Sequence, residues 1–166
     1  AIMISVMNRL NNIKAVIFDW GRTLFDSDKR TEFPESERVL NYCKEKGYRL
    51  AAISLTVKGG SATLEERKRQ VENSPLRGYF EIALVIFGSQ QDKEKSYDEI
   101  IEHFGFLPSE ILIIDDQTNR GIKYGNRHGH PTVWLKQGKF ANELPTEETG
   151  QPAYTITNLK ELLEIL

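Results

Sequence analysis

The sequence predicts an α/β fold: a three-layer sandwich around a central, mainly parallel sheet of five strands. Three observations carry this prediction: five apolar runs of strand length, helical patterns between them, and a length of 166 residues. The apolar runs span residues 14–18, 49–54, 82–87, 111–114 and 132–135. Strands that alternate with helices imply right-handed crossovers and a parallel sheet covered on both faces.

The first apolar run shows how a strand meets the expected site. Residues 15–18 are apolar, Asp19 follows directly, and Gly21 then interrupts the pattern. An apolar run bounded by a turn signal is typical of a buried strand in a parallel sheet. Asp19 is therefore expected at the carboxyl end of a strand, where open α/β sheets bind their ligands.

The segments between the runs have the spacing of amphipathic helices. These patterns span residues 35–46, 64–71, 96–104, 121–128 and 159–166. Gly47 and Gly105 follow the first and third patterns, where a glycine commonly ends a helix. The pattern at 64–71 is strongly charged, so we expect that helix to be mostly solvated.

The whole chain, residues 1–166, is expected to form a single domain. Residues 1–12 are interpreted as an N-terminal tail that packs on this domain, because they lack the basic flank of a signal peptide. Residues 142–152 are rich in Pro, Glu and Thr and predict a surface excursion. A short edge strand is expected after it, at residues 154–156.

Composition excludes several classes of protein. Charged residues make up 28% of the chain and hydrophobic residues 39%, which is typical of a globular protein. The formal net charge of −2 argues against a nucleic-acid partner, which usually requires a basic face. No apolar run has transmembrane length, so no membrane partner is expected. The single cysteine, Cys43, allows no intrachain disulfide and predicts a cytoplasmic location.

Chemically active side chains follow the predicted strands at their carboxyl ends. The set comprises Asp19, Ser54, Thr56, Lys93, Lys95, Asp115 and Asp116. Because the carboxyl ends of parallel strands share one edge of the sheet, we expect these side chains to converge in one crevice. Carboxylates from separate strands are suitable ligands for Mg²⁺, which also binds substrate phosphate. A lysine and a hydroxyl can hold phosphate oxygens, and a carboxylate can attack phosphorus to form an aspartyl-phosphate.

The order of these motifs resembles the haloacid dehalogenase (HAD) superfamily over residues 14–135. The first motif, usually Asp-x-Asp-Gly-Thr-Leu, stands here as residues 19–24, Asp-Trp-Gly-Arg-Thr-Leu. Ser54 matches the second motif, and Lys93 or Lys95 matches the third. The acidic fourth motif is matched at residues 115–119, Asp-Asp-Gln-Thr-Asn. The resemblance implies a Mg²⁺-dependent hydrolase of phosphate monoesters.

The resemblance also implies a role for each site residue. Asp19 would be the nucleophile, and Mg²⁺ would be held by Asp19, Asp116 and the backbone carbonyl of Gly21. Asp115 would either be a further ligand of Mg²⁺ or position the other ligands without contacting the ion. The phosphoryl group would contact Ser54 and Lys93, with Thr56 and Lys95 as rivals. The expected partner is a small phosphorylated substrate, and the oligomeric state stays open.

Departures from the pattern affect the expected activity. Phosphatases of the superfamily carry a second aspartate as general acid and base where this chain has Gly21. Asp115 and Arg22 both replace usual glycines, and the acid expected after Asp116 is Asn119 or absent. General acid–base help is typically worth roughly 10²–10⁴ in rate, so we expect a slow phosphatase. Arg22 either binds the anionic part of the substrate or pairs with Asp26.

Two other functions stay open at this point. The missing acid at Gly21 is compatible with a non-catalytic phosphate-binding or interaction module on the same fold. Branches of the superfamily that cleave carbon–halogen or carbon–phosphorus bonds also lack this acid. The proteins of those branches, however, carry a cap domain. Here the segments that could hold a cap are short, so no separate cap domain is expected. The crevice would be open, or roofed by residues 25–34 or by a second subunit.

Overall fold

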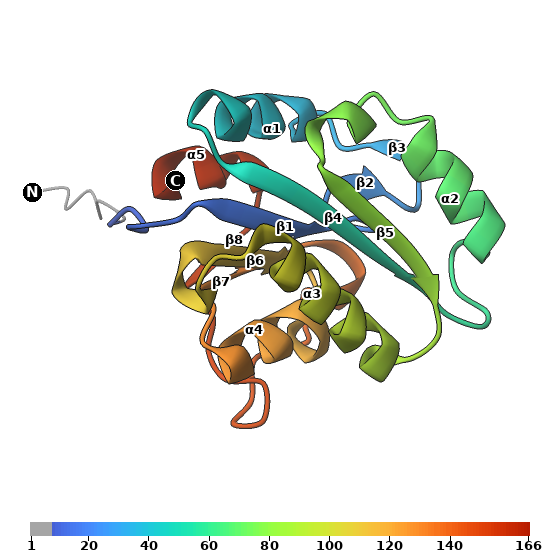
Figure 1. Cartoon of the computed structure of the whole chain (residues 1–166). Coiled ribbons are helices and arrows are strands. Elements are labelled where there is room, and N and C mark those ends of the chain that lie inside the picture. Colours follow the sequence, from blue (N-terminus) through green and yellow to red (C-terminus); the bar gives the residue numbers. More distant parts are fainter. Residues whose placement is uncertain (1–7) are drawn as a thin grey trace, which may run out of the picture.

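A computed structural model describes residues 8–166 and places a six-stranded, all-parallel sheet at the centre of the molecule (Figure 1). The strand order is β5-β4-β1-β6-β7-β8. The bounds are β1 Ala15–Asp19, β4 Arg49–Thr56, β5 Ile82–Phe87, β6 Ile111–Asp115, β7 Thr132–Leu135 and β8 Tyr154–Ile156. The α/β class and the parallel sheet are confirmed. The sheet has six strands and not the predicted five, because the edge strand β8 pairs with β7.

Helices cover both faces of the sheet (Figure 1). Their bounds are α1 Ser36–Glu45, α2 Leu64–Glu72, α3 Gln90–Phe104, α4 Lys123–His128 and α5 Leu162–Ile165. The apolar side chains of α1, α2 and α5 belong to one core cluster, and those of α3 and α4 belong to the other. These two layers of helices and the sheet between them make the expected three-layer sandwich.

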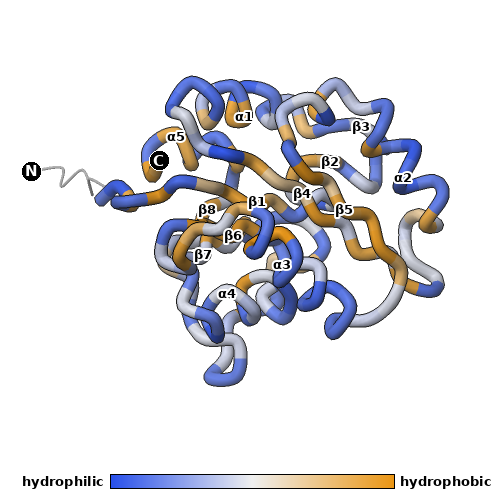
Figure 2. The backbone as a smooth tube through the Cα atoms, in the orientation of Figure 1, coloured by the Kyte–Doolittle hydropathy of each residue, from blue (hydrophilic) through white to orange (hydrophobic). Residues whose placement is uncertain are grey.

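The strands supply alternate residues to the two clusters, as the period of a β-strand requires. In β1, Val16 and Phe18 face the α1 layer, whereas Ala15 and Ile17 face the α3 layer. Figure 2 shows the central strands as apolar along their length, whereas the helices carry polar outer faces. Strands that are buried on both faces explain why the sequence shows continuous apolar runs instead of alternation.

Short elements connect the main ones and complete the layers. A small antiparallel hairpin follows β1, formed by β2 Phe25–Asp26 and β3 Thr31–Glu32. The single-turn elements are η1 Arg77–Tyr79, η2 Pro108–Glu110, η3 Thr118–Ile122, η4 Gly138–Phe140 and η5 Leu159–Glu161. The hairpin lies within the predicted flap of residues 25–34.

Helix α3 begins six residues earlier than the predicted pattern at 96–104. Ser89 precedes its first turn, and the backbone N–H of Ser89 donates to Oδ2 of Asp92 at 2.7 Å, as in a capping box. The helix ends at Gly105, which has a φ of 70°. The early start places Lys93 in the first turn of α3 instead of in a loop.

The expected N-terminal tail includes residues 1–7, which lie outside the part of the chain that the structure describes. The backbone N–H of Leu10 donates to the carbonyl of Ile165 at 2.8 Å, so the described part of the tail contacts the C-terminal helix. Within residues 8–166, every helix is too short or too polar to cross a lipid bilayer.

Candidate active site

The candidate site lies where the strand order reverses direction. From β1 the chain proceeds to β4 and β5 on one side, and later to β6, β7 and β8 on the other. The carboxyl ends of β1 and β6 therefore form the switch point at which open α/β sheets bind ligands. Carboxylate oxygens of Asp19, Asp115 and Asp116 meet there, within 4.8 Å of one another, and all three side chains are buried.

Lys93 supplies the positive charge of this cluster. Its Nζ lies 3.0 Å from Oδ1 of Asp19 and 2.9 Å from Oδ2 of Asp115. Burial disfavours the charged ammonium, but the charges of Asp115 and Asp19 outweigh it and raise the pKa of Lys93 well above its ordinary value. One lysine thus bridges the ends of two strands from the first turn of α3.

Asp115 is held in place by the backbone that follows it. Oδ2 of Asp115 accepts from the N–H of Gly121 at 2.7 Å, and Oδ1 accepts from the N–H of Gln117 at 3.0 Å. A Cβ at Gly121 would lie 2.8 Å from Oδ2 of Asp115 and 2.5 Å from the Tyr97 hydroxyl, so this approach requires glycine. Asp115 does not line the cavity. It anchors Lys93.

Asp116 differs from Asp115 because both of its buried carboxylate oxygens lack a hydrogen-bond partner among the described residues. Burial and the charges of Asp19 and Asp115 raise the pKa of Asp116 to about 10. The backbone of Asp116 is fixed, since Nε1 of Trp134 donates to its carbonyl at 2.9 Å. A rigid, unpartnered carboxylate beside a second one fits a hard cation such as Mg²⁺. Burial and Asp115 also raise the pKa of Asp19, partly offset by Lys93.

The two candidate hydroxyls at the end of β4 differ in what they can offer. Oγ1 of Thr56 donates to the carbonyl of Ile86 at 2.8 Å, so its proton is already used. Oγ of Ser54 accepts from Nη1 of Arg67 at 2.7 Å and keeps its own proton for a ligand. Both residues line the cavity, and Ser54 is the better donor to a bound anion.

Arg67 of α2 also lines the cavity, although the sequence analysis expected this helix to be mostly solvated. That prediction is wrong for Arg67, whose exposed fraction is only 4%. Burial lowers the pKa of Arg67, and the charge of Asp19 partly restores it. A signal was available, because Leu64, Arg67 and Val71 follow one another at the spacing of an inward helix stripe.

Asp19, Ser54, Thr56, Arg67 and Lys93 line a cavity of about 220 Å³. Five cationic side chains line it, and Asp19 is its one carboxylate within residues 8–166; the cations are Arg22, Arg67, Lys93, Arg120 and Lys139. Arg120 comes from η3, which follows β6, and Lys139 comes from η4, which follows β7. Such a lining favours an anionic ligand.

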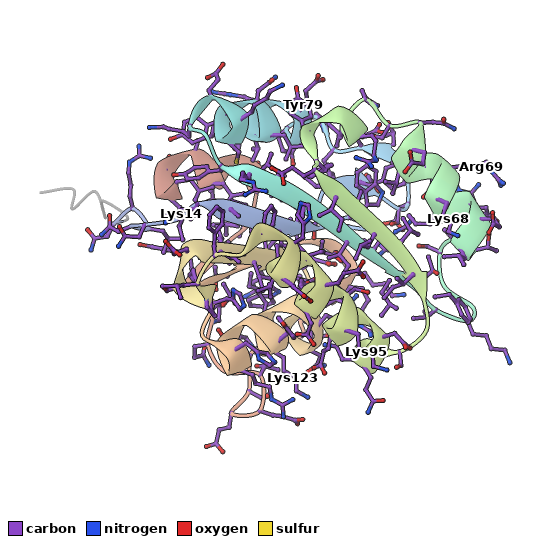
Figure 3. All side chains as sticks on the ribbon, in the orientation of Figure 1. Lys14, Lys68, Arg69, Tyr79, Lys95 and Lys123 are labelled. Atoms are coloured by element: carbon purple, nitrogen blue, oxygen red, sulfur yellow. The ribbon has the colours of Figure 1, made fainter. Side chains whose placement is uncertain are left out.

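Three candidates lie differently from the prediction. Lys95 is exposed on the outer side of α3 and does not line the cavity, so the structure does not bring it to the site (Figure 3). Arg22 does line the cavity, but it pairs with Asp28 and not with Asp26, at 3.1 and 3.2 Å. Oδ1 of Asp26 instead accepts from the backbone N–H groups of Asp28 and Lys29.

Arg22 also has a φ of 64°, in the left-handed region that favours glycine. This backbone conformation agrees with the glycine that the related motif usually has at this position.

Residues 2–135 match the sequence model of a family described as Haloacid dehalogenase-like hydrolase. The chain belongs to this family. Two curated relatives are each named Glyceraldehyde 3-phosphate phosphatase: one from Pyrococcus furiosus, 28% identical over 81% of this chain, and one from Methanopyrus kandleri, 21% identical over 81%. The chain spans about half the length of these relatives, 54% and 56% respectively.

A solved structure shares the fold with this member of the haloacid dehalogenase-like family. It is described as a dehalogenase and superposes with a TM-score of 0.73 at 14% sequence identity, covering 94% of this chain and 98% of that chain. The family membership and the fold class predicted from the motif order are thus confirmed. The roles of the individual site residues stay predictions.

Proposed function

We propose that this chain hydrolyses a phosphate monoester through a covalent aspartyl-phosphate on Asp19. The observation that carries the proposal is the pairing of Asp19 with Lys93 at the base of a cavity lined by cations. Oδ1 of Asp19 accepts a hydrogen bond from Nζ of Lys93 at 3.0 Å, and Oδ2 accepts one from Oγ1 of Thr23 at 3.2 Å. These contacts hold the carboxylate in one orientation, which nucleophilic attack requires.

Mg²⁺ is the proposed cofactor, and its ligands would be Asp19, Asp116 and the backbone carbonyl of Gly21. When bound, the ion supplies positive charge that stabilises the phosphoryl oxygens. The unpartnered oxygens of Asp116 support this assignment. Asp115 takes the role of a supporting acid, because its two oxygens are occupied by Lys93 and by the backbone.

The transferred phosphoryl group would contact Ser54, Arg67 and Lys93. Ser54 keeps a free hydroxyl proton, and Arg67 and Lys93 carry the charge that the anion requires. Thr56 lines the same cavity, but its hydroxyl proton is already donated to the carbonyl of Ile86 and is not available to the phosphoryl group. Arg22 borders the cavity mouth, where it would meet the remainder of the substrate.

The phosphatase names of the curated relatives support a small phosphorylated substrate. The match to this chain covers only 54% and 56% of the length of those relatives. The single-domain organisation, the cytoplasmic location and the oligomeric state therefore stay predictions from the sequence.

Phosphate release from para-nitrophenyl phosphate tests the proposal. Wild type with Mg²⁺ should release phosphate, EDTA should abolish the release, and acid quenching during turnover should leave a phosphoryl group on Asp19, seen by mass spectrometry. Asp19→Asn should be inactive, whereas Asp28→Asn, an exposed acid outside the cluster, should keep its activity. Release that persists in Asp19→Asn from a preparation free of other phosphatases would remove Asp19 as nucleophile.

A non-catalytic phosphate-binding module is the second candidate. The position of Arg67 favours it, because the guanidinium fills the space beside Gly21 in which phosphatases of the superfamily carry their acid. Such a module would bind inorganic phosphate, measured by calorimetry, but would release none from any ester and would form no covalent adduct.

A further inference from the structure

Arg67 is a buried cation without an anionic partner. Its guanidinium donates from Nη1 to Ser54 at 2.7 Å, from Nε to Gln70 at 2.8 Å and from Nη2 to Ser61 at 3.5 Å. These three partners are neutral, and within residues 8–166 no carboxylate lies within ion-pair distance of Arg67. A charge at 4% exposure is costly unless it is compensated. A bound anion in the adjoining cavity would supply that compensation.

The guanidinium lies beside Gly21, the position at which phosphatases of the superfamily carry their acid. Nη1 of Arg67 is 2.7 Å from the position that a Cβ would take at Gly21, two residues after the proposed nucleophile. Nη1 also contacts Ser54, the proposed phosphoryl ligand. Arg67 therefore borders the phosphoryl position on the Gly21 side of the cavity.

The usual general acids are scarce among the described residues that line this cavity. Among the described lining residues there is no imidazole, no thiol and no carboxyl group except Asp19, which the proposed reaction uses as nucleophile. The ammonium of Lys93 is bound to two carboxylates, and an arginine keeps its proton under all ordinary conditions. Lys139 of η4 is the one further ammonium among the described lining residues, and it is exposed. Arg67 is buried and fixed by three hydrogen bonds, so it can stabilise a leaving oxygen that departs as an anion.

We propose that Arg67 stabilises the departing oxygen as an anion, and that the site is thereby selective for acyl and aryl phosphates over alkyl monoesters. This inference rests on the phosphatase function proposed above and specifies its substrate class. A carboxylate or phenolate leaves without a proton, whereas an alkoxide requires one. The chain would then not be a slow version of a general phosphatase, but a phosphatase for good leaving groups.

The proposed reaction balances without a general acid. A carboxylate oxygen of Asp19 forms a bond to phosphorus, the bond from phosphorus to the leaving oxygen breaks, and its electron pair stays on the departing carboxylate or phenolate. Water then attacks the phosphorus of the aspartyl-phosphate and Asp19 leaves as a carboxylate. The proton lost by the water passes to a phosphate oxygen of the product.

The experiment measures kcat/KM for a series of leaving groups, because kcat/KM reports the first phosphoryl transfer. The series runs from 2,4-dinitrophenyl through para-nitrophenyl to phenyl phosphate, with acetyl phosphate and ethyl phosphate as the acyl and alkyl members. We expect kcat/KM to fall steeply along the aryl series. Acetyl phosphate should exceed ethyl phosphate by at least the roughly 10²–10⁴ that general acid catalysis would otherwise supply.

Variants at Arg67 separate its role from a structural one. Arg67→Met removes the charge at similar length and should lower kcat/KM more for phenyl than for 2,4-dinitrophenyl phosphate, which steepens the dependence on the leaving group. Arg67→Lys should restore part of the loss for phenyl phosphate. Arg69→Met changes an exposed arginine of the same helix and should leave the series unchanged (Figure 3). A purely structural role would lower kcat/KM for all members equally.

The outcomes separate this inference from the function on which it rests. If no member of the series is hydrolysed by the wild type with Mg²⁺, the phosphatase function itself fails. If the esters are hydrolysed with little dependence on the leaving group, or ethyl phosphate matches acetyl phosphate, the phosphatase function stands and the selectivity is refuted. If Arg67→Met does not change the slope, Arg67 does not stabilise the leaving oxygen.

Discussion

Nζ of Lys93 lies 3.0 Å from Oδ1 of Asp19, although 74 residues separate the two in the chain. The contact joins the end of β1 to the first turn of α3, and a second contact of 2.9 Å continues it to Asp115 at the end of β6. Three carboxylates and one lysine thus share a buried volume, so the charge of the cluster is unbalanced without a further cation. The first two predictions follow from this imbalance.

Removing the lysine should affect both stability and activity. Lys93→Met leaves the buried carboxylates without their partner, and breaking a buried ion pair typically costs about 3–5 kcal/mol. The loss of a charge beside the phosphoryl group should lower kcat by about 10²–10³. Urea unfolding in EDTA and phosphate release with Mg²⁺ measure the two effects. Lys95→Met is the matched control, and an exposed substitution should change stability by no more than about 0.5 kcal/mol. Equal small effects for both lysines would contradict the assignment.

Metal binding should be visible as thermal stabilisation. Mg²⁺ that binds only the folded chain adds about 2.7 kcal/mol at 100 times its Kd, so the Tm of the wild type should rise with Mg²⁺ concentration. Asp116→Asn should lose this rise but stay at least as stable as wild type in EDTA, because burial and the neighbouring carboxylates already disfavour a charge on Asp116. Asp28→Asn should keep the full rise in Tm. A Tm of wild type that does not respond to Mg²⁺ would argue against a metal site at the cluster.

An acid introduced at Gly21 should not by itself raise turnover. Its Cβ would lie 2.7 Å from Nη1 of Arg67, so the carboxylate of Gly21→Asp would pair with the guanidinium and stay ionised. The double variant Gly21→Asp with Arg67→Met frees the acid and should hydrolyse ethyl phosphate faster than either single variant. The measurement is kcat/KM for ethyl phosphate. A faster Gly21→Asp single variant would show that Arg67 does not occupy the space in solution.

His130 should contribute a loss of stability in mild acid. Its Nδ1 contacts the carbonyl of Ile111 at 3.0 Å, and burial lowers the pKa of His130 below the ordinary value of 6.5. As the pH falls through 6.5, the unfolded chain binds a proton that the folded chain does not, so the free energy of unfolding decreases towards the lower folded pKa. Urea unfolding between about pH 8 and pH 5 measures this contribution as the difference between wild type and a His130 variant. The comparison is needed because the raised pKa values of Asp19 and Asp116 change the stability of wild type in the opposite direction.

The controls for this pH effect are two histidine variants. His130→Gln should be less stable overall, but its free energy of unfolding should increase relative to that of wild type as the pH falls, because the contribution of His130 is removed. His103→Gln replaces a histidine that is 43% exposed, and it should keep the slope of the wild type. A slope that is the same in His130→Gln and wild type would assign the acid sensitivity to other groups.

The sequence was informative about residues that stand at strand ends. Asp19, Asp115 and Asp116 could be located because a buried parallel strand is a continuous apolar run, so its last residue can be read directly. The convergence of these residues then follows from the shared edge of a parallel sheet. The bounds of α3 were harder, because its first turn, residues 90–95, is polar and has no apolar stripe.

Arg67 could not be assigned from composition because burial of a charged helix depends on where the helix packs. Most residues of α2 are exposed, and a charged helix is usually a solvated one. The pairing of Arg22 with Asp28 was also missed, since the turn that brings them together follows from the left-handed backbone at Arg22. Both misses concern side chains whose partners are fixed by tertiary contacts.

The position of β5 at the end of the sheet affects how the protein behaves in concentrated solution. This strand, Ile-Ala-Leu-Val-Ile-Phe, has no charge and no proline, its residues are only partly buried, and Phe87 is 56% exposed. An unpaired edge of this composition is a template for pairing with another chain and for aggregation. Assays are therefore best run on dilute protein, and Ile86→Lys should slow turbidity growth on concentration, because a lysine on an edge strand opposes edge-to-edge pairing.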